Sequence, residues 1–317
     1  MNESKASKFS DFLKTNISLA AFILLFIVFS FSTGGKFFKT DNLMTIAGAS
    51  MDLLVTALGA TFIGLLGSID LSSGSMIALN GVVAAKVYVS TNNLGLALAA
   101  AIGVSLVCYF IIVIAHTKLE VPTFICSLGM LSIARSIVTM ISSGTITMLP
   151  YDSPFKSIFG LRPGILIVGG SLFLICLIIE KFTLFGRYTR LIGGDENVAR
   201  MSGINVNRQK IMVYLFAGLM SAIGGVIMAA RIGSGSPSVG QGYELNVISA
   251  VVLGGTSQRG GIGGVRGTLI GALTLTMLAN GLVLWGMPSE VQLLIKGVVL
   301  ILAVFISQER GTGAIVK

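Results

Sequence analysis

Two short polar stretches decide the fold of this chain: G-S-I-D-L-S-S-G at residues 67–74 and G-S-G-S-P-S-V-G at residues 233–240. Both interrupt long apolar runs, and a shift of 166 positions superimposes them. The same shift aligns 53–85 with 219–251 and gives these identities: Leu53/Leu219, Gly59/Gly225, Gly67/Gly233, Ser68/Ser234, Ser72/Ser238, Gly74/Gly240, Leu79/Leu245, Asn80/Asn246 and Ala84/Ala250. Four of these pairs fall in the polar interruptions, a clustering that shared apolar composition does not explain. The sequence therefore predicts an internal repeat.

The composition places this repeat in a membrane. Hydrophobic residues make up 54% of the 317 residues and charged residues only 11%, whereas about 25% charged residues is usual in soluble domains. So little charge cannot cover a soluble globule, and the apolar runs are long enough to cross a bilayer as helices of about 20 residues. A disordered chain and a separate soluble domain are excluded. We predict an all-α polytopic membrane protein.

The apolar runs predict about ten transmembrane helices, in a single membrane domain over residues 17–307. They cover residues 17–33, 43–66, 74–90, 94–115, 121–143, 165–180, 211–231, 244–258, 268–285 and 290–307. Residues 1–16 are a polar leader and 308–317 a tail. Most of the 22 Lys and Arg face the cytoplasm if both termini do. We therefore expect a multi-pass protein of the inner or plasma membrane with both termini cytoplasmic. This topology also explains the net charge of +9, so we expect no nucleic-acid partner.

The repeat is predicted to be upside down. An odd number of crossings separates the two copies, so the halves, about 43–143 and 211–307, have inverted topology. Inverted repeats are typical of transporters, whose two related halves open alternately around a central site. A broken helix at membrane depth must face protein or a wet cavity, because lipid cannot satisfy its backbone groups. Asp70 and Ser72 would then line or support the route; alternatively, both breaks are interfacial turns and these residues cap the next helix.

The longest inner loop, residues 181–210, predicts a short isolated helix. It contains six basic and two acidic residues, a net charge of +4. Gly193 and Gly194 are expected to break the chain, and Asp195 is a good N-cap for a helix over 196–202. Glu196 and Arg200 form an i,i+4 pair, and Gly203 suits a left-handed end. A helix this short is unstable alone, so we expect it to pack against a peripheral partner; the alternative is a solvated connector.

Several ordered motifs resemble ribose-type ABC importer permeases. They are G-R-Y at 186–188, G-G-D-E-N-V-A-R-M-S-G-I-N-V at 193–206, G-S-I-D-L-S-S-G-S at 67–75, V-V-L-G-G-T-S at 251–257, G-G-I-G-G-V-R-G-T-L-I-G-A-L at 260–273 and N-G-L at 280–282. The resemblance runs from about residue 40 to 306. It implies a ten-helix permease of the type II importer kind that pairs with a second copy or a paralogue. It also implies an ATPase bound to the inner face and an extracytoplasmic binding protein that delivers sugar.

In that family the short helix of this loop is the coupling helix, which sits in a cleft of the ATPase. The coupling positions of this chain are Gly186, Arg187, Tyr188, Gly193, Gly194, Asp195, Glu196, Arg200, Ser202 and Gly203. Two positions depart from the family pattern, because Asp195 and Asp52 stand where the family often has Asn. A carboxylate at the depth of Asp52 costs roughly 2.5–3.5 kcal/mol. We expect Asp52 to line the sugar path or to pair with Arg135; a protonated, tolerated Asp52 is the alternative.

A neutral sugar needs groups that replace its water without binding it tightly, and hydroxyl and amide side chains suit this better than fixed charge. The predicted pathway residues are Asp52, Thr56, Thr61, Asp70, Ser72, Asn80 and Asn246. The prediction is an ATP-driven importer of ribose or a related monosaccharide. Alternatives are an ABC permease for nucleosides, a signalling furanose or branched-chain amino acids, an ion-coupled secondary transporter using Asp52, Asp70 or Glu244, and a passive channel.

Residues 254–267 contain seven glycines, but they do not form a phosphate loop. The chain has no G-x-x-x-x-G-K-[ST] motif, and no strand is predicted before these residues. Gly260/Gly264, Gly263/Gly267 and Gly267/Gly271 instead have the spacing that lets helices approach closely. We therefore expect no enzymatic activity, no metal site and no cofactor in this chain. ATP and magnesium would be bound by the partner ATPase.

Overall fold

The described part of the protein is mostly helical. The computed structural model describes residues 17–309; the predicted leader, 1–16, and residues 310–317 of the predicted tail lie outside the described residues. The elements are α2 (Ile17–Ser32), α3 (Thr40–Ala49), α4 (Met51–Leu65), α5 (Ser73–Thr91), α6 (Leu94–Lys118), α7 (Thr123–Ser142), β1 (Thr147–Met148), α8 (Pro154–Phe159), α9 (Gly164–Phe182), α10 (Leu184–Gly194), α11 (Glu196–Met201), α12 (Val206–Ile232), β2 (Ser234–Gly235), α13 (Tyr243–Leu253), α14 (Val265–Leu284) and α15 (Ser289–Glu309).

The helices match the predicted spans closely, with two differences. The span 43–66 is divided at Ser50 into α3 and α4, and the span 244–258 ends at Leu253. Among the described residues, six helical runs are long and apolar enough to cross a membrane: Thr40–Leu65, α6, α7, α9, α12 and α14. An 11-residue helix such as α13 is about 16 Å long, roughly half the hydrocarbon thickness. The all-α polytopic class is confirmed, and ten crossings remain a prediction.

The core of the bundle is built around α4 and α12. Every residue of α4 except Ala60 is buried, and α12 packs against α4, α5 and α6. Small residues allow this close approach. A Cβ on Gly59 of α4 would lie 2.9 Å from the Cα of Ala217, and a Cβ on Gly225 would lie 2.8 Å from the Ile77 carbonyl oxygen. Gly59 and Gly225, which are equivalent in the repeat, therefore both lie where two helix backbones are in close contact.

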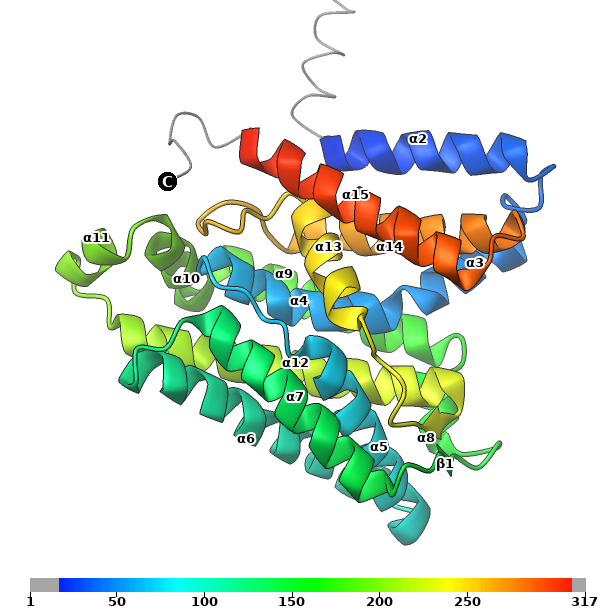
Figure 1. The fold of residues 1–317 in the computed structure, drawn as a ribbon, viewed down its shortest axis with the longest axis horizontal. Coiled ribbons are helices and arrows are strands. Elements are labelled where there is room, and N and C mark those ends of the chain that lie inside the picture. Colours follow the sequence, from blue (N-terminus) through cyan, green and yellow to red (C-terminus); the bar gives the residue numbers. More distant parts are fainter. Residues whose placement is uncertain (1–16, 310–317) are drawn as a thin grey trace, which may run out of the picture.

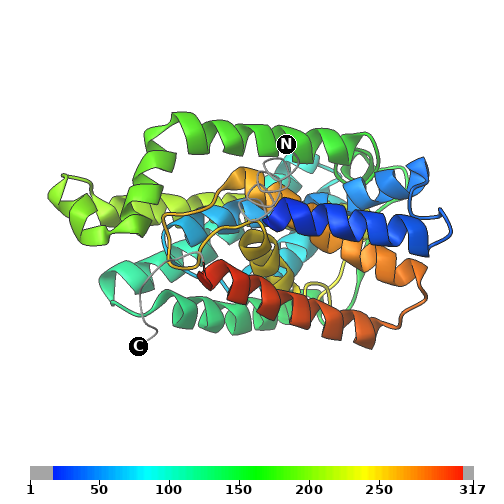
Figure 2. The ribbon, with the colours of Figure 1, turned by 90° about the horizontal axis from the view of Figure 1, so that it is seen from above.

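The outer helices expose apolar side chains. α9 lies along one edge of the molecule (Figure 2) and exposes Ile167, Leu174 and Ile178 while burying Gly169 and Cys176. An extended apolar surface of this kind is expected where lipid, rather than water, surrounds the helix. The outer face of α9 therefore supports a membrane location.

The two polar interruptions are breaks between helices, and they lead to the same place. From the end of the bundle that carries α10 and α11, residues 66–72 return to its centre, where α5 begins (Figure 1). Residues 233–242 start at the opposite end, beside β1 and α8, and return to the centre, where α13 begins. The two breaks meet there, because a Cβ on Gly240 would lie 2.2 Å from the Gly74 carbonyl oxygen.

The glycine-rich stretch is only partly the helical contact that its spacing predicts. Gly267 and Gly271 lie on α14, where their added Cβ atoms would meet the carbonyl oxygens of Gly254 and Ala250 at 1.8 and 2.0 Å, so this pair is confirmed as a close contact with α13. The other two pairs are wrong as helical pairs. Residues 254–264 form a loop in which Gly260, Gly261, Gly263 and Gly264 have positive φ angles, which a helix does not allow.

Candidate functional site

The first break is held by hydrogen bonds to side chains that pack around it. Asp70 is 4% exposed. Its Oδ1 accepts from the backbone N–H of Ser72 at 2.8 Å and from the Ser72 hydroxyl at 2.6 Å, and its Oδ2 accepts from the Tyr109 hydroxyl at 2.7 Å. The Leu71 N–H donates to the Ser127 hydroxyl at 3.1 Å. Asp70 thus organises the turn before α5 and also connects it to α6.

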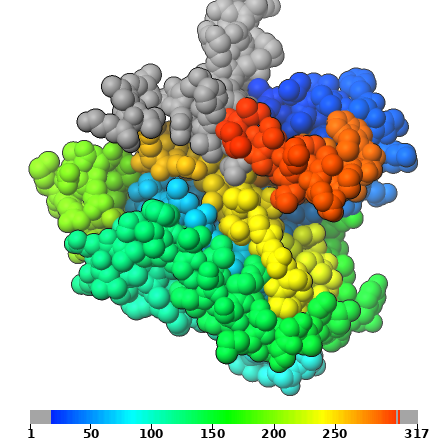
Figure 3. Space-filling model, viewed as in Figure 1, coloured from blue at the N-terminus to red at the C-terminus, as the bar shows by residue number. Residues whose placement is uncertain are grey.

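A small cavity of about 30 Å³ borders this break. Its lining comes from α4, the first break, α13 and the glycine-rich loop: Ala60, Gly64, Ser68, Ile69, Asp70, Ile248, Val251, Val252, Thr256, Ser257 and Gln258. Among the predicted pathway residues, only Asp70 lines it. Figure 3 shows α13 running over this face of the molecule between α7 and the α14/α15 segment. The junction of the two breaks therefore lies close to a surface of the bundle.

The second break is held from a different direction. Arg135 of α7 donates from Nη1 to the carbonyl oxygens of Pro237 and Val239, both at 2.8 Å. β1 pairs with β2 in antiparallel register, Thr147 opposite Gly235. These contacts satisfy backbone groups that lipid would leave unpaired.

Asp52 has a partner that was not predicted. It is 1% exposed, and its Oδ2 accepts from the Tyr243 hydroxyl at 2.8 Å. The guanidinium of Arg231 lies within ion-pair distance, with Nε 3.2 Å from Oδ1. The predicted pairing with Arg135 is therefore wrong, because the Arg135 guanidinium donates to the Pro237 and Val239 carbonyls of the second break. A weak signal was present in the sequence, since Arg231 is the last residue of the predicted span 211–231 and a charge near membrane depth requires a partner.

Two predicted pathway threonines lie inside helix contacts. The hydroxyls of Thr56 and Thr61 donate to the backbone carbonyls four residues earlier, at 2.9 and 2.7 Å. The Thr61 hydroxyl also lies 2.6 Å from that of Thr268 on α14. Both side chains are buried at 3% exposure or less. In this conformation Thr61 connects α4 to α14 and Thr56 bonds within α4, and neither lines the small cavity.

The paired asparagines of the repeat lie in different surroundings. Asn80 is fully buried on α5, where its Nδ2 donates to the Ser105 hydroxyl at 3.3 Å, and the Ser105 hydroxyl donates to the Gly218 carbonyl at 2.8 Å. Asn246 is partly exposed on α13. The two residues occupy equivalent positions in the sequence, but only Asn246 is open to a solute or to another chain.

The predicted loop 181–210 contains two helices, α10 and α11, which form one end of the bundle (Figure 1). Gly186 packs on the end of α9, where a Cβ would lie 2.2 Å from the Glu180 carbonyl oxygen. Gly193 packs on the end of α4, where a Cβ would lie 1.7 Å from the Leu65 carbonyl oxygen, and that oxygen accepts from Gly261 N–H at 2.9 Å. Gly193 and Gly194 do not break the chain. They form the last turn of α10, and the break comes at Asp195.

The short helix predicted over 196–202 is confirmed as α11. The Asp195 carboxylate accepts from the backbone N–H groups of Asn197 and Val198 at 2.8 and 3.0 Å. Arg200 contacts Glu196 at 2.7 Å, and Gly203 has a φ of +80°. Local hydrogen bonds and one left-handed residue thus define both ends, as the sequence predicts.

The tertiary structure adds one anchor to α11 and leaves one face open. Lys210 of α12 contacts the second oxygen of Glu196 at 2.8 Å. Burial raises the pKa of Glu196, but its hydrogen bonds to Lys210 and Arg200 outweigh this effect and hold the pKa below its ordinary value. Ala199 is buried, whereas Val198 and Met201 are 53% and 82% exposed. We call Val198 and Met201 the α11 apolar face.

The remaining coupling positions are on the surface of the same two helices. Arg187 is exposed on α10, and Tyr188 is partly exposed. Ser202 donates its hydroxyl to the Val198 carbonyl at 2.9 Å, next to the end of α11. The predicted coupling positions therefore lie together at one end of the bundle, away from the junction of the two breaks.

Comparison with known proteins places this arrangement among transport proteins. The family described as branched-chain amino acid transport system / permease component matches residues 42–304. The ribose import permease protein of Escherichia coli is 37% identical over 300 residues, which cover 92% of this chain and 93% of the relative. The ribose import permease protein of Bacillus subtilis is also 37% identical, over 92% of each chain.

A relative with a different printed substrate is also similar. The L-arabinose transport system permease protein of Escherichia coli is 36% identical over 254 residues, which cover 79% of this chain and 77% of the relative. No solved structure matches the chain.

Proposed function

This chain belongs to the family described as branched-chain amino acid transport system / permease component, and we propose that it is the membrane subunit of an ABC importer for ribose or a related monosaccharide. The observation that carries the proposal is the similarity to ribose import permeases over more than nine-tenths of both chains. A separate ATPase supplies the energy, and an extracytoplasmic binding protein delivers the sugar. The chain itself contributes the route through the membrane.

The α11 helix is the proposed site of ATPase coupling. Glu196 ties one side of this helix to Lys210, so a force applied to α11 is transmitted to the start of α12. The α11 apolar face points away from this anchor and is open to a partner. A two-turn helix fastened on one side and apolar on the other is suited to docking in a cleft of another protein. The end of the bundle that carries α10 and α11 is then cytoplasmic, as are both termini.

The proposed sugar route passes the junction where the two breaks meet. Asp70, Ser68 and Gln258 supply polar groups around the cavity beside the first break, and Asn246 is accessible on α13. The surrounding helices are connected by hydrogen bonds of Asp52, Thr61 and Asn80. Thr56 and Ser72 bond locally, within α4 and within the first break. Weak, replaceable hydrogen bonds suit the passage of a neutral polyol.

The inverted repeat and the dimer belong to the same proposal. α4 and α12 are each followed by a break that returns to the centre from opposite ends, and the equivalent glycines, Gly74 and Gly240, meet there. This arrangement supports two inverted halves within ten crossings. The junction lies near a face of the bundle, and lipid cannot satisfy broken helices. A second copy or a paralogue covering that face would give the route a polar boundary.

The experiment is sugar uptake by proteoliposomes containing this chain, its ATPase and its binding protein. We expect ATP-dependent ribose uptake that survives an ionophore; uptake that follows an ion gradient without ATP would refute the proposal in favour of a secondary transporter. L-arabinose is the second sugar to test, since one relative carries that name. Uptake of leucine, of a nucleoside and of a signalling furanose is measured in the same way to test the alternative substrates.

Coupling is tested with a matched pair of variants. Met201→Glu places a charge on the α11 apolar face and is expected to weaken ATPase binding at least tenfold and to reduce uptake correspondingly. Met148→Glu makes the same change at a methionine that is 73% exposed at the opposite end of the bundle, and should leave ATPase affinity unchanged. Equal ATPase affinity in the two variants, measured by titration in detergent, would remove α11 from the interface.

A further inference from the structure

We propose that the cleft between α9, α10 and α14 binds the phosphate headgroup of an anionic phospholipid. The cleft has a volume of about 270 Å³ and is lined by Leu177, Glu180, Lys181, Arg190, Gly254, Gly263, Gly264, Arg266 and Gly267. Three cations and one carboxylate thus share its wall. The sugar route and the α11 apolar face use none of these four charges, so the cleft requires a separate explanation.

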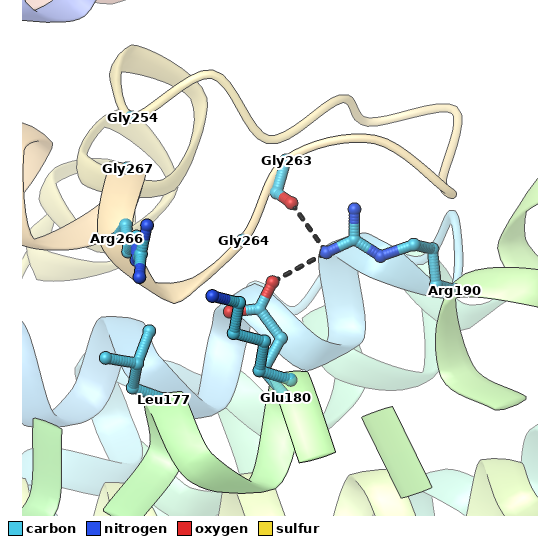
Figure 4. Close-up of a pocket in the computed structure, with 9 residues that line it drawn as sticks. Leu177, Glu180, Arg190, Gly254, Gly263, Gly264, Arg266 and Gly267 are labelled. Atoms are coloured by element: carbon cyan, nitrogen blue, oxygen red, sulfur yellow. Dashed lines mark hydrogen bonds and ion pairs between the residues drawn. The ribbon is translucent and has the colours of Figure 1, made fainter. Parts of the chain in front are cut away.

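Both oxygens of the single carboxylate in the cleft have a partner. Glu180 Oε1 accepts from Arg190 at 2.6 Å, and Oε2 accepts from the backbone N–H of Val265 at 2.9 Å. The same Arg190 nitrogen donates to the Gly263 carbonyl at 3.0 Å. Figure 4 shows Arg190 and Arg266 on opposite sides of Glu180. Glu180 therefore holds the cleft together and neutralises Arg190, the one cation that lies within ion-pair distance of it among the described side chains.

Lys181 and Arg266 carry the excess positive charge. Both side chains are exposed, and no carboxylate lies within ion-pair distance of either among the side chains that the structure describes, residues 18–299, 301 and 302. Their backbones are positioned by the end of α9 and the start of α14. Two uncompensated cations at a cleft attract a phosphate, which can accept hydrogen bonds from both.

The surroundings of the cleft favour a lipid over a soluble anion. The cleft lies at the end of α9, whose exposed Leu174, Ile175 and Ile178 continue away from it along the edge of the bundle. Acyl chains can therefore lie on the apolar surface of α9 while the phosphate remains between Lys181 and Arg266. Basic pockets at the ends of membrane helices are suited to anionic headgroups. The proposed orientation makes this the cytoplasmic leaflet; the binding itself does not depend on the transport function.

The test is native mass spectrometry of the full chain in detergent, without ATPase, titrated with phosphatidylglycerol or phosphatidylcholine. We expect phosphatidylglycerol to bind at least tenfold more tightly. The double variant Lys181→Gln/Arg266→Gln should weaken phosphatidylglycerol binding roughly 30-fold, since each basic residue near an anionic lipid surface contributes about 1 kcal/mol. Lys36→Gln/Lys39→Gln is the control, because it removes two exposed charges near the start of α3 and should leave the affinity unchanged.

Three results would overturn the proposal. The first is equal affinity for the two lipids, and the second is unchanged phosphatidylglycerol binding by the cleft variant. The third is that inorganic phosphate competes fully with the lipid at equal concentration, which would assign the cleft to a soluble anion. The variants are also titrated with the ATPase in lipid-free detergent. A loss of ATPase affinity with lipid binding intact would assign the cleft to that protein.

Discussion

The two helix breaks stand at equivalent positions in the repeat, but different side chains satisfy their backbone groups. In the first break, the Asp70 carboxylate accepts from the Ser72 N–H, and the Ser127 hydroxyl accepts from the Leu71 N–H and donates to the Ile69 carbonyl at 3.4 Å. In the second, the Arg135 guanidinium donates to two backbone carbonyls. A broken helix leaves both kinds of group unpaired. The contrast shows that the repeat preserves the position of the break but not the means of stabilising it.

The difference also concerns where the stabilising residue lies in the sequence. Asp70 belongs to the break that it organises, whereas Arg135 comes from α7, about 100 residues before its acceptors. The first break therefore carries its own main anchor, and the second depends on a neighbouring helix and on β1. Because α7 contacts both breaks, through Ser127 and Arg135, the second break is expected to differ from the first mainly in its response to movement of the β1 segment.

The largest expected effect is at the contact between the two breaks. Gly240→Ala combines a left-handed φ of +76° with a Cβ placed 2.2 Å from the Gly74 carbonyl oxygen, and should destabilise the protein by about 4 kcal/mol. Gly242→Ala is the control, since its φ is +71° but its Cβ would meet no atom within 4 Å; it should cost only about 1–2 kcal/mol. Unfolding in detergent measures both, and equal costs would mean that the breaks do not need to touch.

The first break is tested at Asp70. Asp70→Ala removes the acceptor of three hydrogen bonds and should cost about 3 kcal/mol, because hydrogen bonds to charged groups contribute roughly 1.5–3 kcal/mol and the buried Tyr109 hydroxyl loses its partner. Asp70→Asn retains an oxygen for Ser72 and should cost about 1 kcal/mol. The measurement is again the free energy of unfolding. If the two variants are equally damaging, the charge of Asp70 has a role beyond accepting these bonds.

The smallest effect is expected at the second break. Arg135→Leu leaves the Pro237 and Val239 carbonyls without their donor and should cost about 2 kcal/mol, less than Asp70→Ala because Arg135 is only partly buried and β1 still pairs with β2. Arg135→Lys restores one donor and should recover about half of the loss. Hydrogen exchange should increase over 233–242 and remain unchanged over 66–72. Faster exchange in both breaks would show that they are not anchored separately.

The sequence predicted those features that depend on near neighbours along the chain. Three such features are the cap of α11 by Asp195, the Glu196/Arg200 contact and the left-handed Gly203. Each involves residues four or fewer positions apart, where helix geometry alone determines which groups are in contact. For Asp70 and Ser72 the sequence left two alternatives, a lining role and a turn. The structure shows that Asp70 organises the turn and also lines the small cavity.

Only the tertiary structure decided the contacts between distant segments. Asp52 meets Arg231 and Tyr243, which are 179 and 191 positions away, and Lys210 joins Glu196 across 14 positions. Apolar periodicity identifies each helix, but it does not say which helices are neighbours or how they are rotated, since several partners can bury the same apolar face. A charged residue in an apolar span indicates that a partner of opposite charge or a hydrogen-bonding group lies nearby, but only the packing of the helices decides which residue that partner is.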